Sequence, residues 1–475
     1  MGCSHPGSKD QGGIAVVAPL VARARAAQAR YERYSQEQVD EVVTAAGWAI
    51  VKPENNRRLA ELAVADTGLG NVADKIVKNE RKTMGLLRDL QQAKSVGVIA
   101  EYPELGIVEI ARPAGVVAAI TPSTNPGATP ANKIINALKG RNAVIVAPSP
   151  KGWSTCALLL DFLRIEFKKI HADADLVQIL PAPVTKQTTQ ELMRACDLVV
   201  ATGSQANVRA AYASGTPAVG VGLGNVAVIV DESADLDDAA GKIRDSKIFD
   251  NATSCSSENA AVILEAVYAF ALKELTNVGG ALLTADEKAR LQKAMWPDGK
   301  LNPDIMARPI ESILKAAGLT RKELQGAKFL IVEETGVGKD SPFSGEKLSL
   351  VLTVYKARSF DDAFALVKKI YAYQGAGHSV GIHTKDDAHV MRLGLEMPAA
   401  RVIVNQAHAI ANGGAYDNGL PFSLSMGCGT WGRNSISENM NYRHYLNITR
   451  IVRPIAPRVP TVEGLFGAYH RNHGR

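Results

Sequence analysis

The amino-acid sequence predicts an α/β protein with a doubly wound parallel sheet. Short apolar segments alternate with helical patterns between residues 115 and 230, which is typical of successive βαβ units. At 475 residues, the chain is also too long for one ordinary hydrophobic core, so we expect two large lobes. Sheets of this kind bind ligands at the carboxyl ends of their strands, and we expect a site there.

The N-terminal part is predicted to be helical. A polar segment, residues 1–13, is expected to be flexible, and an Ala- and Arg-rich helical pattern runs from it through Ile50. This segment lacks the basic start, apolar middle and cleavage site of a signal peptide. Residues 98–110 then alternate in polarity around a turn at residues 103–106, which predicts a β-hairpin.

The parallel sheet is predicted next. Residues 115–120 and 143–147 are apolar strand patterns, and the helical pattern of residues 130–138 between them completes a βαβ unit. Three further strands are expected, with helices between them, at residues 176–180, 197–201 and 226–230. Later in the chain we expect an insertion or a pair of surface helices at residues 283–319 and a β-strand at residues 445–452.

Composition argues against several classes of function. The 54 basic and 48 acidic residues give a net charge of +6 and are spread along the chain, unlike the basic runs of a nucleic-acid arm. No apolar run is long enough to span a bilayer. The five cysteines, at positions 3, 156, 196, 255 and 428, show no paired metal-ligand spacing, which predicts reduced thiols in a cytoplasmic protein without a metal site.

The segment around Cys255 is the most informative local feature. Residues 249–258 read Phe-Asp-Asn-Ala-Thr-Ser-Cys-Ser-Ser-Glu and place one thiol among small hydroxyl side chains. Small neighbours leave room for a substrate and for backbone N–H groups that hold an oxyanion, so the segment predicts a nucleophile loop. The alternative interpretation is an inert cysteine in a small-residue loop.

Two polar loops follow predicted strands. Residues 121–127 read Thr-Pro-Ser-Thr-Asn-Pro-Gly, and residues 202–204 read Thr-Gly-Ser. Each loop either caps the following helix or contacts a ligand at the strand end. Gly220, Gly222 and Gly224 are spaced like a dinucleotide fingerprint but precede a strand, so the usual motif does not apply.

Five motifs, in this order along nearly the whole chain, resemble the coenzyme A-acylating aldehyde dehydrogenases of the aldehyde dehydrogenase superfamily. They are Ile120-Thr-Pro-Ser-Thr-Asn-Pro126, Thr202-Gly-Ser204, Phe249-Asp-Asn251 with Cys255, Glu346-Lys-Leu-Ser349 and Cys428-Gly-Thr-Trp-Gly432.

This resemblance implies two doubly wound parallel-sheet lobes and a β oligomerisation arm. We expect a nucleotide-binding lobe at residues 14–230, whose hairpin at about 98–110 joins the arm, and a catalytic lobe at residues 231–430. Residues 431–475 would return to the nucleotide lobe and supply a C-terminal strand to the arm. A homodimer or homotetramer is therefore expected.

The resemblance also implies a reaction. Cys255 would attack an aldehyde, and its backbone N–H with a donor from Thr124 or Asn125 would hold the oxyanion. Hydride transfer to NAD or NADP would leave a thioester on Cys255, which coenzyme A removes as a second substrate. Hydrolytic relatives carry a glutamate base in the segment that corresponds to residues 221–225, which here has no carboxylate. Thiolysis is therefore favoured, unless Glu258 or Glu334 supplies a base for water.

Cofactor residues follow from the same resemblance. Glu346 is expected to accept hydrogen bonds from the nicotinamide ribose, although an exposed loop charge is the alternative. Residues 146–151 lack the lysine that holds the adenosine ribose in hydrolytic relatives, and Lys151 or Arg209 is available for a 2′-phosphate, so NAD and NADP stay open. The full set expected to hold the dinucleotide is Thr121, Pro122, Ser123, Ser149, Thr202, Gly203, Ser204, Gly222, Gly224, Glu346 and Leu348.

The substrate is expected to be an anionic aldehyde. Arg433 follows the Trp-Gly pair, where relatives that act on uncharged aldehydes often carry glycine, and Cys428 is expected to pack near the pocket. His378 would either assist proton transfer from a thiol or, the favoured interpretation, complete a hydrogen bond in the core. Residues 251–259 look most like the sulfoacetaldehyde dehydrogenases, whose sulfonate an Arg fork would bind.

Other functions remain open from the sequence. Succinate semialdehyde is the closest competing substrate, followed by acetaldehyde or propionaldehyde. A hydrolytic aldehyde dehydrogenase is the alternative reaction, and a silent nucleotide-binding assembly protein is the alternative without catalysis.

Overall fold

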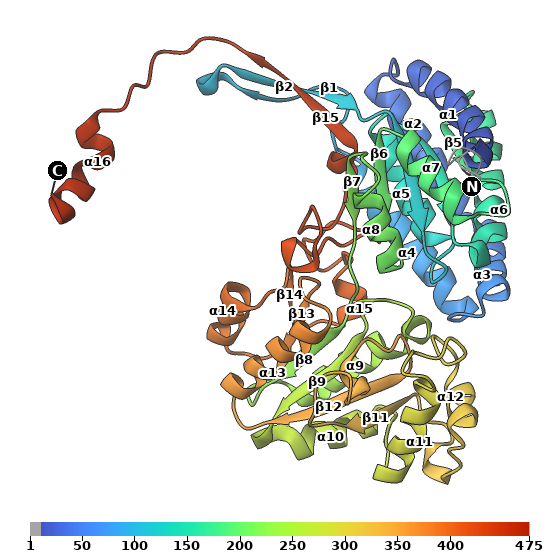
Figure 1. The fold of residues 1–475 in the computed structure, drawn as a ribbon, viewed down its shortest axis with the longest axis vertical. Coiled ribbons are helices and arrows are strands. Elements are labelled where there is room, and N and C mark those ends of the chain that lie inside the picture. The colour runs from blue at the N-terminus through green and yellow to red at the C-terminus, as the bar shows by residue number, and fades with distance from the viewer. Residues whose placement is uncertain (1–10, 475) are drawn as a thin grey trace, which may run out of the picture.

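The computed structural model describes residues 11–474. Figure 1 shows two lobes, one above the other in this view, and a β-arm that leaves the upper lobe. Each lobe is built around its own parallel sheet, as the α/β pattern predicts. None of the helices in the described part combines the length and the apolar content that crossing a membrane requires.

The upper lobe holds a five-stranded parallel sheet. Both central strands are buried along their whole length, which is typical of a parallel sheet covered by helices on both faces. The strand order is β5 (Val177–Ile179), β4 (Ala143–Pro148), β3 (Val116–Thr121), β6 (Leu198–Ala201) and β7 (Ala218–Gly220). The helices of this lobe are α1 (Gln11–Tyr31), α2 (Gln36–Val51), α3 (Pro53–Thr67), α4 (Val72–Leu90), α5 (Ala128–Lys139), α6 (Trp153–Lys169), α7 (Lys186–Ala195) and α8 (Gln205–Tyr212).

The lower lobe holds a seven-stranded parallel sheet. Its strand order is β10 (Gly280–Leu282), β11 (Phe329–Glu333), β12 (Val351–Ala357), β9 (Glu258–Leu264), β8 (Val226–Val230), β13 (Val380–His383) and β14 (Val402–Val404). Its helices are α9 (Leu236–Ile248), α10 (Tyr268–Asn277), α11 (Ala285–Met295), α12 (Ile310–Ala317), α13 (Phe360–Tyr373), α14 (Asp387–Glu396) and α15 (His408–Ala411). Residues 283–319, expected to be an insertion or a helix pair, contain α11 and α12.

Alternating side chains of the lower sheet build two separate cores. In β8, Val228 and Val230 enter the core with α10, α11 and α12, whereas Ala227 and Ile229 enter the core with α13. Successive residues of a strand point to opposite faces, so an uninterrupted apolar strand fills both cores at once. The continuous apolar run in β8 follows from this double burial.

The arm is a three-stranded antiparallel sheet in the order β1 (Gly97–Tyr102), β2 (Ile107–Pro113) and β15 (Leu446–Val452). β1 and β2 form the predicted hairpin, and the C-terminal strand β15 pairs with β2 in register from Leu446 opposite Pro113 to Val452 opposite Ile107. After β15 the chain runs away from both lobes and ends in α16 (Val462–His473) (Figure 1).

Two expectations about boundaries need correction. β8 pairs with β9 and β13 and so belongs to the lower sheet, not to the lobe proposed to end at residue 230. The sequence shows an apolar strand but not its partners, and β7, which was not predicted, is the edge strand of the upper sheet instead. α1 begins at Gln11, inside the segment 1–13 expected to be flexible, and residues 1–10 with Cys3 lie outside the described residues.

Candidate functional site

A cavity of about 350 Å³ lies where loops of both lobes meet, and Cys255 lines it. Its wall combines the loop after β3, the loop after β6, the glycine-rich segment before β8 and the Cys255 loop. Of the residues predicted for the site, this cavity brings together Pro122, Ser123, Thr124, Asn125, Thr202, Gly203, Ser204, Gly222, Gly224, Cys255, Glu346 and Leu348.

The Cys255 loop has an unusual backbone. Asp250, Asn251 and Ala252 all adopt positive φ angles, of 51°, 51° and 59°. Residues with a Cβ rarely take this conformation, and each costs about 1–2 kcal/mol, so surrounding contacts must hold the segment. Asn251 Nδ2 donates to the carbonyl oxygens of Gly70 and Ala307, at 3.2 and 3.3 Å, which attaches the loop to both lobes.

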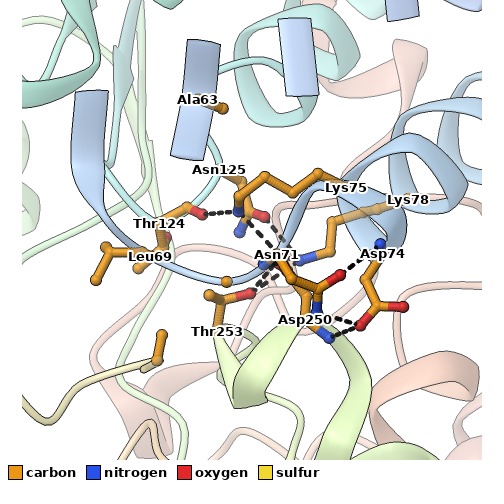
Figure 2. A network of polar contacts seen from close by, with 12 residues as sticks. Ala63, Leu69, Asn71, Asp74, Lys75, Lys78, Thr124, Asn125, Asp250 and Thr253 are labelled. Atoms are coloured by element: carbon orange, nitrogen blue, oxygen red, sulfur yellow. Dashed lines mark hydrogen bonds and ion pairs between the residues drawn. The ribbon is translucent and has the colours of Figure 1, made fainter. Parts of the chain in front are cut away.

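The carboxylate of Asp250 is the centre of the network shown in Figure 2. It is fully buried and pairs with Lys75, at 3.1 Å, and with Lys78, both from α4. It also accepts from the backbone N–H of Asn71 at 3.0 Å. Gly70, at φ 74°, passes so close that a Cβ would lie 1.8 Å from Asp250 Oδ1, so only glycine fits there.

Lys78 connects this network to Asn125. Its ammonium group donates to Asn125 Oδ1 at 2.8 Å and to Thr253 Oγ1 at 2.9 Å, as well as to Asp250 (Figure 2). Because lysine only donates, the Asn125 oxygen must face Lys78. Asn125 Nδ2 donates to no residue within 11–474 and is left as a donor in a side chain that lines the cavity.

Thr124 is held through its backbone. Lys75 Nζ lies 3.3 Å from the Thr124 carbonyl oxygen, and Thr124 lines the cavity beside Asn125. Between the two candidate oxyanion donors, the fixed orientation of the amide favours Asn125.

Cys255 is partly exposed to the cavity and is a thiol at rest. Burial, together with the nearby Glu346 and Cys428, raises the pKa of Cys255 to about 12. A thiol is a weak nucleophile, so the site needs a proton acceptor or a change in electrostatics when ligands bind.

His378 lines the same cavity, and one of its two imidazole nitrogens is hydrogen-bonded. Nδ1 is 2.8 Å from Ser379 Oγ, whose other neighbour is His408 Nε2 at 2.8 Å. Nε2 of His378 has no hydrogen-bond partner in the described chain. Burial keeps the pKa of His378 well below its usual value, so the ring is neutral at pH 7. The core hydrogen bond favoured from the sequence is present on one nitrogen, and the other nitrogen is available as a base.

Glu346 contributes the carboxylate among the residues that line this cavity. Burial raises the pKa of Glu346 to about 8, with Lys347 and Lys247 opposing the shift. Its carboxylate accepts no hydrogen bond from residues 11–474, so it is available to a ligand hydroxyl.

The segment 221–225 passes close to the nucleophile. A Cβ at Gly224 would lie 2.0 Å from the Cys255 carbonyl oxygen, and no side chain fits in that position. The two alternative bases lie elsewhere. Glu258 is fully buried against Ser246, and Glu334 pairs with Lys288 at 3.0 Å; neither lines the cavity.

A second cavity, of about 460 Å³, adjoins the first at the ends of β3, β4 and β6. Thr121 and Ser149 line it, and the two cavities share Pro122, Ser123, Gly203 and Ser204. Ser204 caps α8, because its side chain accepts a hydrogen bond from the Asn207 N–H at 3.3 Å. The capping interpretation is therefore correct, and it leaves room for a ligand contact as well. The Thr121 hydroxyl is buried and has no hydrogen-bond partner among residues 11–474.

Cys428 and Arg433 lie outside both cavities. Cys428 is fully buried, and its Sγ would be 3.2 Å from a Cβ at Gly222, so it packs behind the glycine-rich segment. Asn434 Oδ1 links the two segments by accepting from the N–H groups of Cys428 and Gly222, at 2.9 and 3.0 Å. Arg433 is exposed, with φ 57°.

Sequence reasoning missed the basic residues of α4. Lys75, Lys78 and Lys82 are buried although they are charged, and they recur at intervals of three and four residues. Such spacing places them on one face of a helix, and this is the signal from which they were predictable. Lys186 lines the second cavity, and no comparable spacing of basic residues in the sequence predicts its position there.

Comparison with known proteins identifies the family of this chain. A model of the aldehyde dehydrogenase family matches residues 9–331. The acylating sulfoacetaldehyde dehydrogenase of Cupriavidus necator is 61% identical over 472 residues, which cover 99% of this chain and 96% of the relative. A protein of the same name from Bilophila wadsworthia is 44% identical over 457 residues, covering 95% and 98%.

A solved structure matches the fold over almost its full length. The acetylating aldehyde dehydrogenase of Geobacillus thermoglucosidasius superposes with a TM-score of 0.91 at 35% identity, covering 96% of this chain and all of that one. The overall fold is thus shared with that acetylating aldehyde dehydrogenase.

Proposed function

Since this chain belongs to the aldehyde dehydrogenase family, we propose that it oxidises sulfoacetaldehyde to its coenzyme A thioester with NAD(P)⁺. The relatives named acylating sulfoacetaldehyde dehydrogenase, at 61% and 44% identity, support this substrate and reaction. The observation in the site that carries the proposal is the cavity around Cys255, in which Asn125 presents a free amide donor while residues 221–225 offer no carboxylate.

In the first step, the Cys255 thiol passes its proton to the neutral imidazole of His378, which releases it to solvent before coenzyme A reacts, and Cys255 Sγ forms a bond to the aldehyde carbon. The carbonyl oxygen becomes an oxyanion, which Asn125 Nδ2 and the Cys255 backbone N–H are positioned to bind. A dinucleotide held by the residues of the two adjoining cavities would supply the hydride acceptor for oxidation of the reacting carbon. The acyl group is then held as a thioester on Cys255.

The second step transfers the acyl group to coenzyme A. The coenzyme A thiolate attacks the thioester carbon, and Cys255 leaves as a thiolate. This exchange of one thiolate for another does not change the oxidation state of the acyl carbon. Within the cavity, His378 Nε2 is the neutral nitrogen available to accept the coenzyme A proton. Water needs a stronger base than a thiol does, and neither Glu258 nor Glu334 reaches the cavity, which disfavours hydrolysis.

The two adjoining cavities fit a dinucleotide. Their shared wall is made of backbone and small side chains at Pro122, Ser123, Gly203 and Ser204, which allows a ligand to extend from one to the other. The buried Thr121 hydroxyl, without a partner in the part of the chain that the structure describes, would donate to such a ligand. We infer that Ser149 and Thr121 lie on the adenosine side, and that Glu346 and Leu348 lie on the nicotinamide side near Cys255.

We further propose that the arm joins two copies of this chain. β1 and β15 are both edge strands, and they expose Val98, Tyr102, Ile451 and Val452 to 44%, 40%, 40% and 70%. Exposed apolar edges of this kind pair readily with another strand. Light scattering is expected to give a mass of two or four times 50.6 kDa, and a stable monomer would contradict this part of the proposal.

Product analysis tests the proposed reaction. Purified protein with sulfoacetaldehyde, NAD(P)⁺ and coenzyme A should form the acyl thioester, identified by mass spectrometry, in equal amount to NAD(P)H. Cys255→Ser should abolish both products while the fold, measured by circular dichroism, is unchanged. Free sulfoacetate as the first product would instead indicate the hydrolytic reaction.

A further inference from the structure

A third, smaller cavity adjoins the catalytic one and is lined by three cations of α4. Its volume is about 30 Å³, roughly twice what a single water molecule needs, so it fits a compact group and not a long chain. The wall shared with the catalytic cavity consists of Asn125, Ser254 and Leu424. The cations are Lys78, Arg81 and Lys82.

Lys78 is already neutralised. It pairs with Asp250 and donates to Asn125 and Thr253, which uses its three N–H donors. Its role is therefore structural within the network of Figure 2.

Arg81 and Lys82 differ, because neither forms an ion pair with any carboxylate of residues 11–474. Arg81 donates to the Ile410 carbonyl oxygen at 3.3 Å, which leaves most of the guanidinium donors free. Lys82 donates to the carbonyl oxygens of Gly413, at 2.7 Å, and Gly414, at 3.4 Å. Carbonyl oxygens satisfy hydrogen bonds but do not balance the charge.

Burial of the positive charges of Arg81 and Lys82 costs free energy. Lys82 is only 8% exposed, and desolvation of a cation without a counter-ion is expensive. The ring of Phe422 lies 5.9 Å from Arg81 Cζ and 5.4 Å from Lys82 Nζ and offsets part of this cost. An anionic ligand supplies the missing counter-charge.

We infer that this cavity binds the anionic end of the aldehyde, with Arg81 as the residue that recognises it. The inference rests on the proposed function and adds the position of the sulfonate. In sulfoacetaldehyde the sulfur is two bonds from the carbonyl carbon. A sulfonate in the small cavity therefore leaves the carbonyl beside the wall formed by Asn125 and Ser254, next to Cys255.

The chemistry of Arg81 suits a sulfonate. A planar guanidinium donates two parallel N–H bonds to two oxygens of one anion, and the remaining N–H of Lys82 is available to the third. A carboxylate one bond farther from the carbonyl, as in succinate semialdehyde, would use the same donors but needs a longer reach. Arg433, expected from the sequence to act as the clamp, lines neither this cavity nor the catalytic one.

Substrate preference tests the inference. The ratio of kcat/KM for sulfoacetaldehyde to that for propionaldehyde would be measured with saturating NAD(P)⁺ and coenzyme A. Arg81→Met is expected to lower this ratio at least about tenfold while propionaldehyde oxidation changes less than about twofold, because only the anion loses its partner. Arg81→Lys should recover part of the preference, since it keeps the charge and loses the fork.

Arg88→Met is the matched control. Arg88 lies two turns along the same helix and also stacks on Phe422, at 5.0 Å, but it is paired with Asp89 and does not line the cavity. The ratio of kcat/KM for sulfoacetaldehyde to that for propionaldehyde in Arg88→Met should equal that of the wild type. An unchanged ratio in Arg81→Met, or a ratio that instead falls in Arg433→Met, overturns the inference and leaves the acylating function intact.

Inhibition of the wild-type protein by a sulfonate without an aldehyde group tests the inference without relying on the folding of any variant. Ethanesulfonate should inhibit propionaldehyde oxidation by the wild type competitively and should inhibit Lys82→Met and Arg81→Met less. Absence of competitive inhibition of the wild type contradicts the inference. Absence of coenzyme A-dependent oxidation with every aldehyde contradicts the proposed function instead.

Discussion

Lys78 Nζ lies 2.8 Å from Asn125 Oδ1 and fixes which way the Asn125 amide faces. The same ammonium group pairs with Asp250, five positions before Cys255, so one helix residue holds both the proposed oxyanion donor and the loop of the proposed nucleophile. Figure 2 shows this convergence of α4, the loop after β3 and the Cys255 loop.

Lys78→Met is expected to lower kcat for sulfoacetaldehyde and propionaldehyde alike, by about 10- to 100-fold. The amide of Asn125 loses the contact that orients it, and this affects the transition state of every aldehyde. KM should change little. Lys75→Met is the comparison, because Lys75 also pairs with Asp250 but contacts only the backbone of Thr124. A selective loss of sulfoacetaldehyde oxidation in Lys78→Met would contradict this role.

Alkylation of Cys255 should report its raised pKa. Burial raises this pKa to about 12, so below pH 9 the thiolate fraction, and with it the rate of reaction with iodoacetamide, should rise about tenfold per pH unit. Mass spectrometry of the Cys255 peptide would separate it from the buried Cys156, Cys196 and Cys428. A plateau in rate between pH 7 and 8 would show instead a thiol that is already ionised.

Dinucleotide binding should strengthen as pH rises through 8. Burial raises the pKa of Glu346 to about 8, so the carboxyl group is mostly protonated at pH 7 and mostly ionised at pH 9. A carboxylate accepts hydroxyl hydrogen bonds more strongly, and the Kd for NAD(P)H should fall by up to about tenfold over this range. Fluorescence titration measures it, and Glu346→Gln should be independent of pH. The same pH dependence in Glu346→Gln would assign the effect to another group.

The preference for the anionic aldehyde should weaken above pH 7. Burial, together with the nearby charges of Arg81 and Lys78, lowers the pKa of Lys82 to about 7. The segment packed over it, residues 413–414 and Phe422, adds carbonyls and a ring but no charge. Deprotonation removes one positive charge, so the sulfoacetaldehyde-to-propionaldehyde ratio should fall about threefold or more from pH 6.5 to 8.5. Lys82→Met should show a constant, lower ratio.

The order of elements was predictable from the sequence because periodicity reports burial. Fully apolar strands such as β3 and β4 indicate a parallel sheet covered on both faces, and the hairpin of β1 and β2 follows from its turn residues. The sheet to which β8 belongs was not predictable, because strand pairing depends on contacts far apart in the chain.

The segments that line the cavity around Cys255 were predictable, and the small cavity lined by Arg81 and Lys82 was not. Cys255 and Asn125 stand in local motifs whose residue types carry the chemistry. Arg81 and Lys82 lie in a helix more than 170 residues before Cys255, and only the fold brings them beside it. Arg433 was a plausible partner for the anion because it directly follows a family motif, but it is exposed and lines neither the catalytic cavity nor the small one.

Dependence on coenzyme A tests the central claim most directly. NAD(P)H formation from sulfoacetaldehyde would be followed in a stopped-flow instrument with and without coenzyme A, beside succinate semialdehyde and propionaldehyde. Without coenzyme A, the acylating mechanism predicts a burst of at most one NAD(P)H per Cys255 and then no turnover, because the thioester cannot leave. With coenzyme A, turnover should continue and should be fastest with sulfoacetaldehyde. Sustained turnover without coenzyme A would contradict the account and show that water removes the acyl group.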